Sequence, residues 1–343
     1  MTQPVLSVRD LRVEFVTRRG VLKAIDGVSF DIAPGEVLGV VGESGAGKSV
    51  TGSAVIGLID PPGRIAGGEV WLSEQRIDNL SPEEMRRIRG KRIGMIFQDP
   101  LTSLNPLYRV GEQLVETIQT HTDLSAAAAR RRAIELLTEV GIPAPERRID
   151  GYPHEFSGGM RQRVVIALAL CAEPELIIAD EPTTALDVSV QAQIISLLQR
   201  LGREHGTAIM LVTHDMGVIA ETADRVAVMY AGRIAEIGPV QDVVQNPLHP
   251  YARGLMGAIP TLAQDASRLV QIPGSMPRLS AIPPGCPFNP RCPHAWDRCR
   301  IDRPEPIQHG AHKVACHLYD LNDPTAEAHK VLTHPPAEEG VPA

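Results

Sequence analysis

A glycine-rich segment at residues 42–49 carries the residue types that bind phosphate. Its sequence is Gly-Glu-Ser-Gly-Ala-Gly-Lys-Ser, and it follows an apolar run at 37–41. Between a strand and a helix, this Walker A pattern lets backbone N–H groups converge on phosphate oxygens. Lys48 is expected to reach the β- and γ-phosphates and Ser49 to ligate Mg²⁺. The alternative, a glycine-rich turn with a surface lysine, explains the context less well, so the segment predicts binding of a nucleoside triphosphate. The expected contacts are Gly42, Glu43, Ser44, Gly45, Ala46, Gly47, Lys48, Ser49 and Val50.

Two acids follow an apolar run at 176–179, which has the composition of a buried strand. Asp180, at the strand tip, is placed as a Walker B aspartate that holds the Mg²⁺ shell. Glu181 comes next and is expected to act as the general base for the attacking water. The alternative is a core strand with two solvated carboxylates at its end. The Walker A segment upstream favours the catalytic interpretation.

The segment 156–163, Phe-Ser-Gly-Gly-Met-Arg-Gln-Arg, opens a helix roughly twenty residues before these acids. Alone, Ser-Gly-Gly indicates only an N-capped helix. Its placement resembles the signature of ATP-binding-cassette (ABC) ATPases, although Phe156 and Met160 depart from the commonest wording, Leu-Ser-Gly-Gly-Gln. The resemblance implies that the signature contacts the γ-phosphate of ATP bound to another subunit in a head-to-tail dimer. The signature residues expected to make this contact are Ser157, Gly158 and Gly159.

Further family motifs follow in the expected order. Gln98 resembles the Q-loop glutamine that senses Mg²⁺ and the attacking water, which gives Ser49, Gln98 and Asp180 as expected Mg²⁺ contacts. Asp187, in Ala-Leu-Asp at 185–187, resembles the D-loop that crosses the dimer interface. His214 resembles the switch histidine that contacts the γ-phosphate. Phe15 stands where the family places an aromatic ring on adenine, or it is a strand residue that faces the core.

The elements that must position these residues alternate along the chain. Apolar patterns predict strands at 5–15, 27–32, 70–72, 93–97, 176–179, 208–212, 226–230 and 233–237. Helical spacing extends over 110–140, with Ser125 as an N-cap and Gly141 as a stop, and returns at 189–205. This alternation around a P-loop indicates an α/β core. With the resemblance, it predicts an ABC-ATPase core with an antiparallel β subdomain and an α-helical subdomain inserted at about 99–170.

Composition limits the classes of protein that fit. The chain has 343 residues, with 43% hydrophobic and 22% charged residues, and a net charge of −7 that argues against broad nucleic-acid binding. The N-terminus lacks the pattern of a secretory signal, and the apolar run 164–172 is too short to span a bilayer. A membrane role would therefore come through partners, with the chain peripheral at the cytoplasmic face. From about 245, proline becomes frequent, which divides the chain into a nucleotide-binding domain (1–245), a small C-terminal region (246–325) and a disordered tail (326–343).

Three classes of ABC protein compete. A DNA-repair or chromosome-structure ATPase would have a long coiled coil between its Walker motifs, and the interval here shows no sustained heptads. A translation-factor protein would carry two cassettes, whereas this chain has one Walker A motif and one signature. The remaining class is the ATPase subunit of a transporter.

The segment 246–255, Asn-Pro-Leu-His-Pro-Tyr-Ala-Arg-Gly-Leu, resembles the region after the cassette in ATPases of oligopeptide, dipeptide and nickel importers. The opening loop at 15–20 and the stretch 97–106 resemble the same family. The resemblance implies an importer of di- or oligopeptides, with nickel or another small solute as the alternative. It also implies two membrane permease subunits, a substrate-binding protein outside the membrane, and a second ATPase subunit that is either a copy of this chain or a paralogue.

Four cysteines, Cys286, Cys292, Cys299 and Cys316, lie in one short region at intervals of five, six and sixteen residues. Four thiolates can close around zinc or an iron–sulfur cluster. Zinc sites usually pair cysteines two to four residues apart, which none of these intervals matches. The pattern also resembles the cysteine motif of peptide-importer ATPases, which implies a [4Fe–4S] cluster. Zinc, with His294, His312 or His317 replacing one ligand, and four unrelated reduced thiols are the alternatives.

Overall fold

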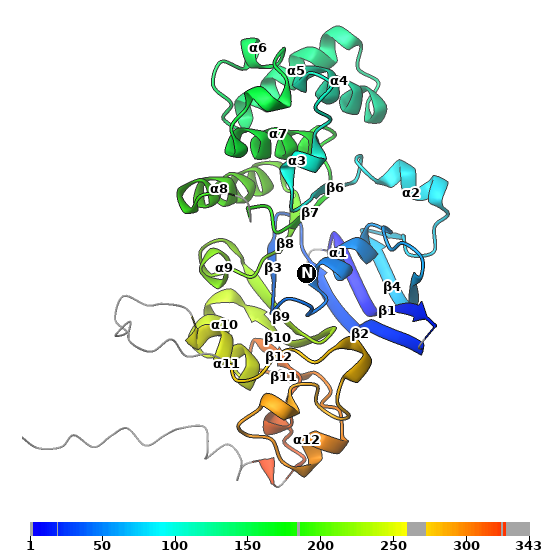
Figure 1. The fold of residues 1–343 in the computed structure, drawn as a ribbon, viewed down its shortest axis with the longest axis vertical. Coiled ribbons are helices and arrows are strands. Elements are labelled where there is room, and N and C mark those ends of the chain that lie inside the picture. The colour runs from blue at the N-terminus through cyan, green and yellow to red at the C-terminus, as the bar shows by residue number, and fades with distance from the viewer. Residues whose placement is uncertain (1–2, 19, 184–185, 259–271, 324, 327–343) are drawn as a thin grey trace, which may run out of the picture.

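The computed structural model describes residues 3–18, 20–183, 186–258, 272–323 and 325–326, and its strands form two sheets (Figure 1). One sheet has the order β2-β1-β4-β5 and the other has the order β11-β12-β10-β9-β3-β8-β7-β6. The strands are β1 (Leu6–Thr17), β2 (Gly20–Ile32), β3 (Val37–Val41), β4 (Gly63–Leu72), β5 (Gln75–Arg76), β6 (Ile93–Ile96), β7 (Leu176–Asp180), β8 (Ala208–Val212), β9 (Arg225–Tyr230), β10 (Arg233–Pro239), β11 (Ile307–His309) and β12 (His312–Val314). The α-helices are α1 (Lys48–Val55), α2 (Pro82–Ile88), α3 (Pro100–Ser103), α4 (Val110–His121), α5 (Ala126–Glu139), α6 (Pro145–Arg148), α7 (Gly158–Leu170), α8 (Val188–His205), α9 (Met216–Thr222), α10 (Val240–Gln245), α11 (Pro250–Gly257) and α12 (Asp297–Ile301).

The larger sheet has a parallel centre that confirms the predicted α/β core. Strand β3 lies between β8 and β9, and β7 lies between β6 and β8, all in parallel register. Every residue of β3 and β8 is buried, which explains their continuous apolar sequences. Because parallel strands end at the same edge of a sheet, the loops that follow β3, β6, β7 and β8 meet there. These loops carry the predicted site residues.

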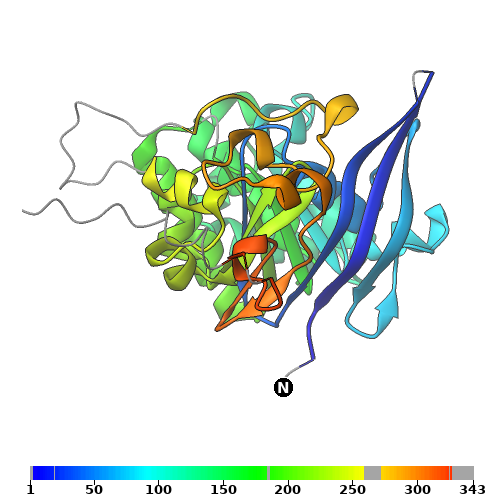
Figure 2. The same cartoon turned by 90° about the horizontal axis from the view of Figure 1, so that it is seen from below.

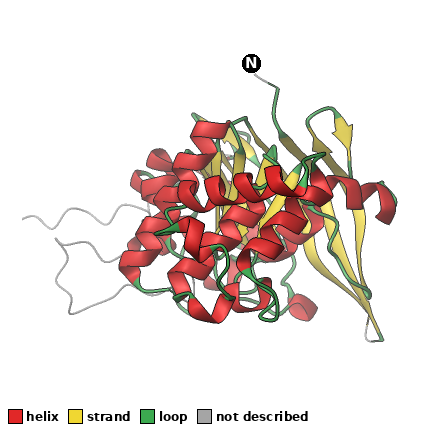
Figure 3. Cartoon of the chain, turned by 90° about the horizontal axis from the view of Figure 1, so that it is seen from above, coloured by secondary structure: helices red, strands yellow, loops and turns green. Residues whose placement is uncertain are grey.

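The smaller sheet is antiparallel and begins with a long hairpin. We expected a loop at 15–20, but β1 continues to Thr17 and β2 begins at Gly20. Phe15 pairs with Leu22 in this hairpin. Figure 3 shows the antiparallel sheet on one side of the molecule and most of the helices on the other.

The helices α3 to α7 form a helical subdomain between β6 and β7, at the top of Figure 1. Ser125 is the N-cap of α5 and its hydroxyl accepts a hydrogen bond from the N–H of Ala128, as predicted. Gly141 follows α5 with a φ of 75°, the left-handed conformation that ends helices. No helix within the described ranges is long and apolar enough to cross a bilayer.

The chain after β10 remains attached to the larger sheet rather than forming a separate body. Strand β12 pairs with β10 and β11 pairs with β12, which extends the sheet at its edge. Glu236 of β10 is fully buried and accepts hydrogen bonds from the N–H groups of Leu248 and His249. It also contacts Nδ1 of His312 at 2.7 Å. Figure 2 shows this C-terminal region lying beside the β1–β2 hairpin. We expected residues 326–343 to form a disordered tail; Ala326 is described and buried, and residues 327–343 lie outside the described residues.

His249 supplies a test of this packing. It caps α11, and its Nδ1 accepts the N–H of Tyr251 at 3.0 Å, which requires the neutral ring. Complete burial lowers the pKa of His249 to about 4. Below pH 6.5 the unfolded chain binds a proton that the folded chain does not, so the free energy of unfolding falls as pH decreases towards 4.

We expect this residue to account for a loss of up to about 3 kcal/mol between pH 6.5 and 4. Chemical denaturation of wild-type protein and His249→Asn at several pH values measures it, since asparagine keeps a capping acceptor and does not titrate. The pH dependence of the variant should be shallower. An equal pH dependence of the free energy of unfolding in the two proteins would show that the pKa of His249 does not differ between the folded and unfolded states.

Candidate functional site

The Walker A loop leaves β3 and enters α1 through two conformationally restricted glycines. Gly42 has a φ of 152°, and a Cβ atom there would lie 2.3 Å from the carbonyl oxygen of Met229. Gly47 is the N-cap of α1 with a φ of 103°. Both positions therefore require glycine. Ala46 is buried beneath the loop, whereas Ser44 and Gly45 are exposed at its tip.

Lys48 turns back into the loop that precedes it. Its Nζ donates to the carbonyl oxygens of Gly42 at 2.9 Å and Glu43 at 3.2 Å, and the residue is only 6% exposed. Burial lowers the pKa of Lys48, while the charges of Glu181 and Asp180 act in the opposite direction. The ammonium group is thus enclosed by the loop that is expected to bind phosphate.

The ends of β7 and α1 bring together oxygen ligands suited to Mg²⁺. The Ser49 hydroxyl donates to Oδ1 of Asp180 at 2.9 Å. Burial is the main cause that raises the pKa of Asp180, and the Ser49 hydrogen bond opposes it. The described residues contain no group of three or more His, Cys, Asp or Glu side chains that could hold a metal. Mg²⁺ needs no such group, because it takes one or two carboxylates and completes its shell with phosphates and water.

The carboxylate of Glu181 lies between side chains from the loops that follow two other strands. Gln98, after β6, donates its amide to Oε2 of Glu181 at 3.0 Å. Nδ1 of His214, after β8, lies 3.4 Å from Oε1 of the same carboxylate. Glu181 has a φ of 47°, uncommon for a residue with a side chain and frequent at active sites. The three residues predicted to arrange the attacking water are therefore in contact.

The signature residues lie in a different part of the chain. Ser157 is the N-cap of α7, its hydroxyl accepts the N–H of Met160 at 3.3 Å, and it is exposed. In Figure 1, α7 lies among the helices of the helical subdomain, above α1. Gly158 and Gly159 form the first residues of α7. The start of α7 is therefore exposed, as contact with a second subunit requires.

Three further predicted contacts, Asp187, Phe15 and Val50, lie apart from the Glu181 cluster and, like the other nucleotide contacts, stay predictions. Asp187 is exposed as the N-cap of α8, whereas Ala185 of the same motif lies outside the described residues. Phe15 is partly buried and, like Val50, packs against a hydrophobic core that includes residues of both sheets. The structure therefore supports the core-facing interpretation of Phe15 without testing the adenine contact.

Two residues of the C-terminal region, Tyr251 and Arg291, contact Glu43, and neither was predicted as a site residue. The N–H of Glu43 donates to the hydroxyl of Tyr251 at 2.8 Å. The carboxylate of Glu43 binds both terminal nitrogens of Arg291 at 2.9 Å. Glu43, predicted as a nucleotide contact, is therefore held by the C-terminal region.

The four C-terminal cysteines do converge. All four line one cavity of about 10 Å³, together with His249, His294 and His317. Burial raises the pKa of Cys286 to about 11 and that of Cys292 to about 12. His312 binds Glu236 and lies elsewhere. Within the described part of the chain, no group of three or more His, Cys, Asp or Glu side chains is arranged to hold a metal ion. The structure therefore does not support the expected metal centre.

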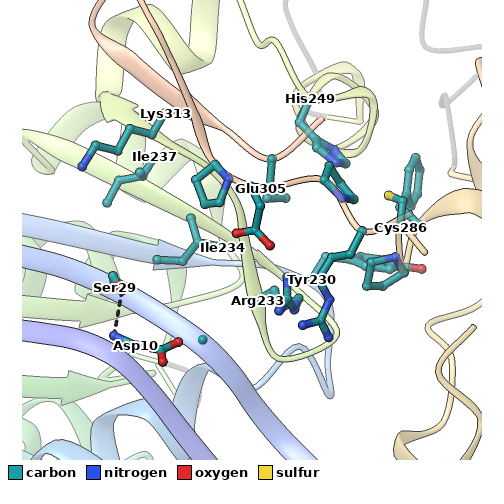
Figure 4. A pocket seen from close by; sticks show the side chains of 18 of the residues that line it. Asp10, Ser29, Tyr230, Arg233, Ile234, Ile237, His249, Cys286, Glu305 and Lys313 are labelled. Atoms are coloured by element: carbon teal, nitrogen blue, oxygen red, sulfur yellow. Dashed lines mark hydrogen bonds between the residues drawn. The ribbon is translucent and has the colours of Figure 1, made fainter. Parts of the chain in front are cut away.

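A larger cavity, of about 230 Å³, lies between the β1–β2 hairpin and the C-terminal region (Figure 4). Arg233 and Arg303 line it, and both bind the carboxylate of Asp26. None of the predicted nucleotide contacts lines this cavity. It marks a second junction between the C-terminal region and the cassette.

The fold and the site together define an ATP-binding-cassette ATPase. The family described as "ABC transporter" matches residues 25–184, and that described as "Oligopeptide/dipeptide transporter, C-terminal region" matches residues 235–299. The dimeric structure of the ATP-binding cassette MJ0796, in a post-hydrolysis state bound to ADP and Pi, superposes with a TM-score of 0.61. Its sequence is 30% identical, and the match covers 68% of this chain and 98% of that one.

Curated relatives define the family more narrowly. The dipeptide transport ATP-binding protein DppD of Bacillus subtilis is 48% identical over 320 residues, which cover 93% of this chain and 96% of that protein. The oligopeptide transport ATP-binding protein OppD of Salmonella typhimurium is 51% identical over 294 residues, 86% and 88% of the two chains. The chain belongs to the family of dipeptide and oligopeptide transport ATP-binding proteins.

Glu181→Gln tests the assignment of the general base. The amide keeps the shape of the side chain and cannot accept the proton of water, so phosphate release should fall about 10²-fold or more while ATP binding persists. Phosphate release and ATP binding are measured on the same protein. Glu173→Gln is the matched control, since Glu173 is an exposed acid that also has a positive φ. Turnover of Glu181→Gln within about threefold of wild type would exclude Glu181 as the base.

Proposed function

We propose that this chain is the ATP-hydrolysing subunit of an importer that takes up dipeptides or oligopeptides through separate membrane permease subunits. The observation that carries the ATPase step is the contact of Glu181 with Gln98 and His214 at the sheet edge that also holds Lys48. The printed names of the relatives favour peptides over nickel as the substrate.

In this proposal, hydrolysis consists of positioning and charge neutralisation. Water attacks the γ-phosphorus, its proton passes to the Glu181 carboxylate, and the bond to the β-phosphate oxygen breaks to give ADP and phosphate. Lys48 neutralises charge on the β- and γ-phosphates, and His214 and Gln98 hold Glu181 and the water in line. Bound Mg²⁺, with Ser49, Asp180 and Gln98 as its expected ligands, would neutralise the remaining phosphate charge.

The permease subunits are proposed to dock on the helical subdomain at the cytoplasmic face of the membrane. A cavity of about 450 Å³ is lined by residues of β6 and by residues of two helices of this subdomain, α3 and α7. Phe97 lines it and is 46% exposed, and Leu107 and Tyr108 in the next loop are also exposed. Exposed apolar side chains are a feature of protein-binding surfaces, which supports this docking site. Peptide would reach the permease from a substrate-binding protein on the outer side.

A head-to-tail dimer would complete each nucleotide site with Ser157 of the other subunit. In a homodimer, Lys48→Ala should weaken ATP binding, whereas Ser157→Arg should spare it and block hydrolysis. Mixing the two inactive proteins tests the arrangement, because each heterodimer keeps one site with both residues intact. With random pairing, activity should recover to about a quarter of the wild-type rate.

No recovery on mixing, with heterodimers shown to form, would exclude a shared site across Ser157. If the partner is a paralogue, the same variants are combined with it in the assembled transporter. Ser157→Arg on this chain should then inactivate only the site whose Walker A loop belongs to the paralogue.

For the four-cysteine region we propose a bound metal centre, either the [4Fe–4S] cluster that the family resemblance implies or zinc. The support is the convergence of four thiols on one cavity. The cavity has room for about one water-sized sphere, so a cubane would require the thiols to move apart more than a single zinc ion would.

Protein purified without oxygen should be brown with about four irons per chain if the cluster is present. Cys292→Ser should bleach the colour and increase proteolysis within residues 280–320, since small loop-rich regions depend on their metal for stability. Elemental analysis decides between the alternatives. One zinc per chain would replace the cluster by zinc, and protein without metal would exclude both.

A further inference from the structure

The peptide group between Gly42 and Glu43 is held on both of its sides. Its carbonyl oxygen, from Gly42, accepts the ammonium of Lys48 at 2.9 Å. Its N–H, from Glu43, donates to the hydroxyl of Tyr251 at 2.8 Å. Because a peptide group is planar, these two hydrogen bonds together set its tilt. Tyr251 therefore acts on the same peptide that positions the lysine of the nucleotide site.

The side chain of Glu43 adds a second attachment to the C-terminal region. Both of its carboxylate oxygens bind the guanidinium of Arg291 at 2.9 Å. Such a bidentate, charge-assisted pair fixes orientation as well as distance. Without it, the buried guanidinium would lose its counter-charge, which is costly.

Arg291 is itself fixed by its surroundings. It is 9% exposed, its Nε donates to the carbonyl oxygen of Pro273 at 2.8 Å, and its guanidinium lies over the rings of Tyr230 and Phe288. Tyr251 is fully buried and packs edge-on against Tyr230, with ring centroids 4.6 Å apart. The anchor of Glu43 is thus a packed aromatic cluster rather than a mobile surface side chain.

From these contacts we infer that Arg291 and Tyr251 are positioning residues for the nucleotide site, through which the C-terminal region sets the affinity for ATP. Neither residue touches the reacting atoms. They act through Glu43 on the peptide that holds Lys48. The inference rests on the proposed ATPase function.

Tyr251→Phe and Arg291→Met test the inference in the full-length chain. The first removes one hydroxyl from a buried ring and the second removes the ion pair while keeping a long side chain. We expect each to raise KM and the dissociation constant for ATP about fivefold or more, with a smaller change in kcat. Since both act through Glu43, adding Arg291→Met to Glu43→Gln should weaken binding little further.

Two matched variants separate positioning from general loosening of the region. Arg298→Met removes the ion pairs of Arg298 with Asp320 and Asp323, and Tyr319→Phe removes a hydroxyl bond to the carbonyl oxygen of Leu248. Both changes lie within the C-terminal region and away from the Walker A loop. They should leave KM for ATP unchanged.

Equal effects of the test and control variants, or additive effects of Glu43→Gln and Arg291→Met, would overturn the inference. So would an unchanged ATP dissociation constant in a folded Tyr251→Phe protein. Binding is measured separately from turnover. Wild-type protein that binds ATP without hydrolysing it would therefore count against the proposed function. The ratios of the ATP dissociation constants of the variants to that of wild type would still decide the role of Arg291 and Tyr251.

Discussion

The buried ammonium group of Lys48 is the interaction on which the site depends. A charge that is only 6% exposed needs acceptors and counter-charges, because burial without them is costly. The carbonyl oxygens of Gly42 and Glu43 supply the acceptors, and Asp180 and Glu181 supply the counter-charges. These groups come from the loop after β3 and from the carboxyl end of β7, which lie at the same edge of the sheet because the strands are parallel. The parallel sheet therefore places the carboxylates that balance the charge of the Lys48 ammonium group.

The central motifs were predictable because each is short and follows an apolar strand. Apolar runs that form buried strands are visible in the sequence. Asp180 ends one such strand, His214 closely follows another, and Lys48 begins the helix after the glycine-rich loop that follows β3. Their common edge then follows from the parallel arrangement alone. The cap at Ser125 was predictable for the same local reason, since capping depends on residues only three positions apart.

Other contacts lacked any local pattern. Tyr251 and Arg291 reach Glu43 across 208 and 248 residues. Tyr251 lies in the segment 246–255 that resembles the importer family, but nothing in that segment indicates a contact with the Walker A loop. Strands β11 and β12 have three residues each, too few for alternation to be visible, so the extension of the sheet was missed. The strand through Phe15 was predicted, but the family resemblance gave a loop at 15–20 where β1 continues to Thr17.

The C-terminal region thus has two kinds of attachment to the cassette. Glu236 and β12 join it to the sheet, where they define its place in the fold. Arg291 and Tyr251 join it to the Walker A loop, where they bear on nucleotide binding. The four cysteines lie between these attachments, lining a cavity that His249 and Phe288 also line. Because the guanidinium of Arg291 lies over Phe288 and pairs with Glu43, a chain of contacts joins that cavity to the Walker A loop.

The most direct test of this account is the structure of Glu181→Gln bound to ATP and Mg²⁺ in its assembled transporter. The account predicts ATP between the Walker A loop of one ATPase subunit and the Ser-Gly-Gly signature of the other, with Lys48 on its phosphates and Glu43 still paired with Arg291. ATP held by one subunit alone, or a Walker A loop that has left Arg291 and Tyr251 when ATP is bound, would contradict it.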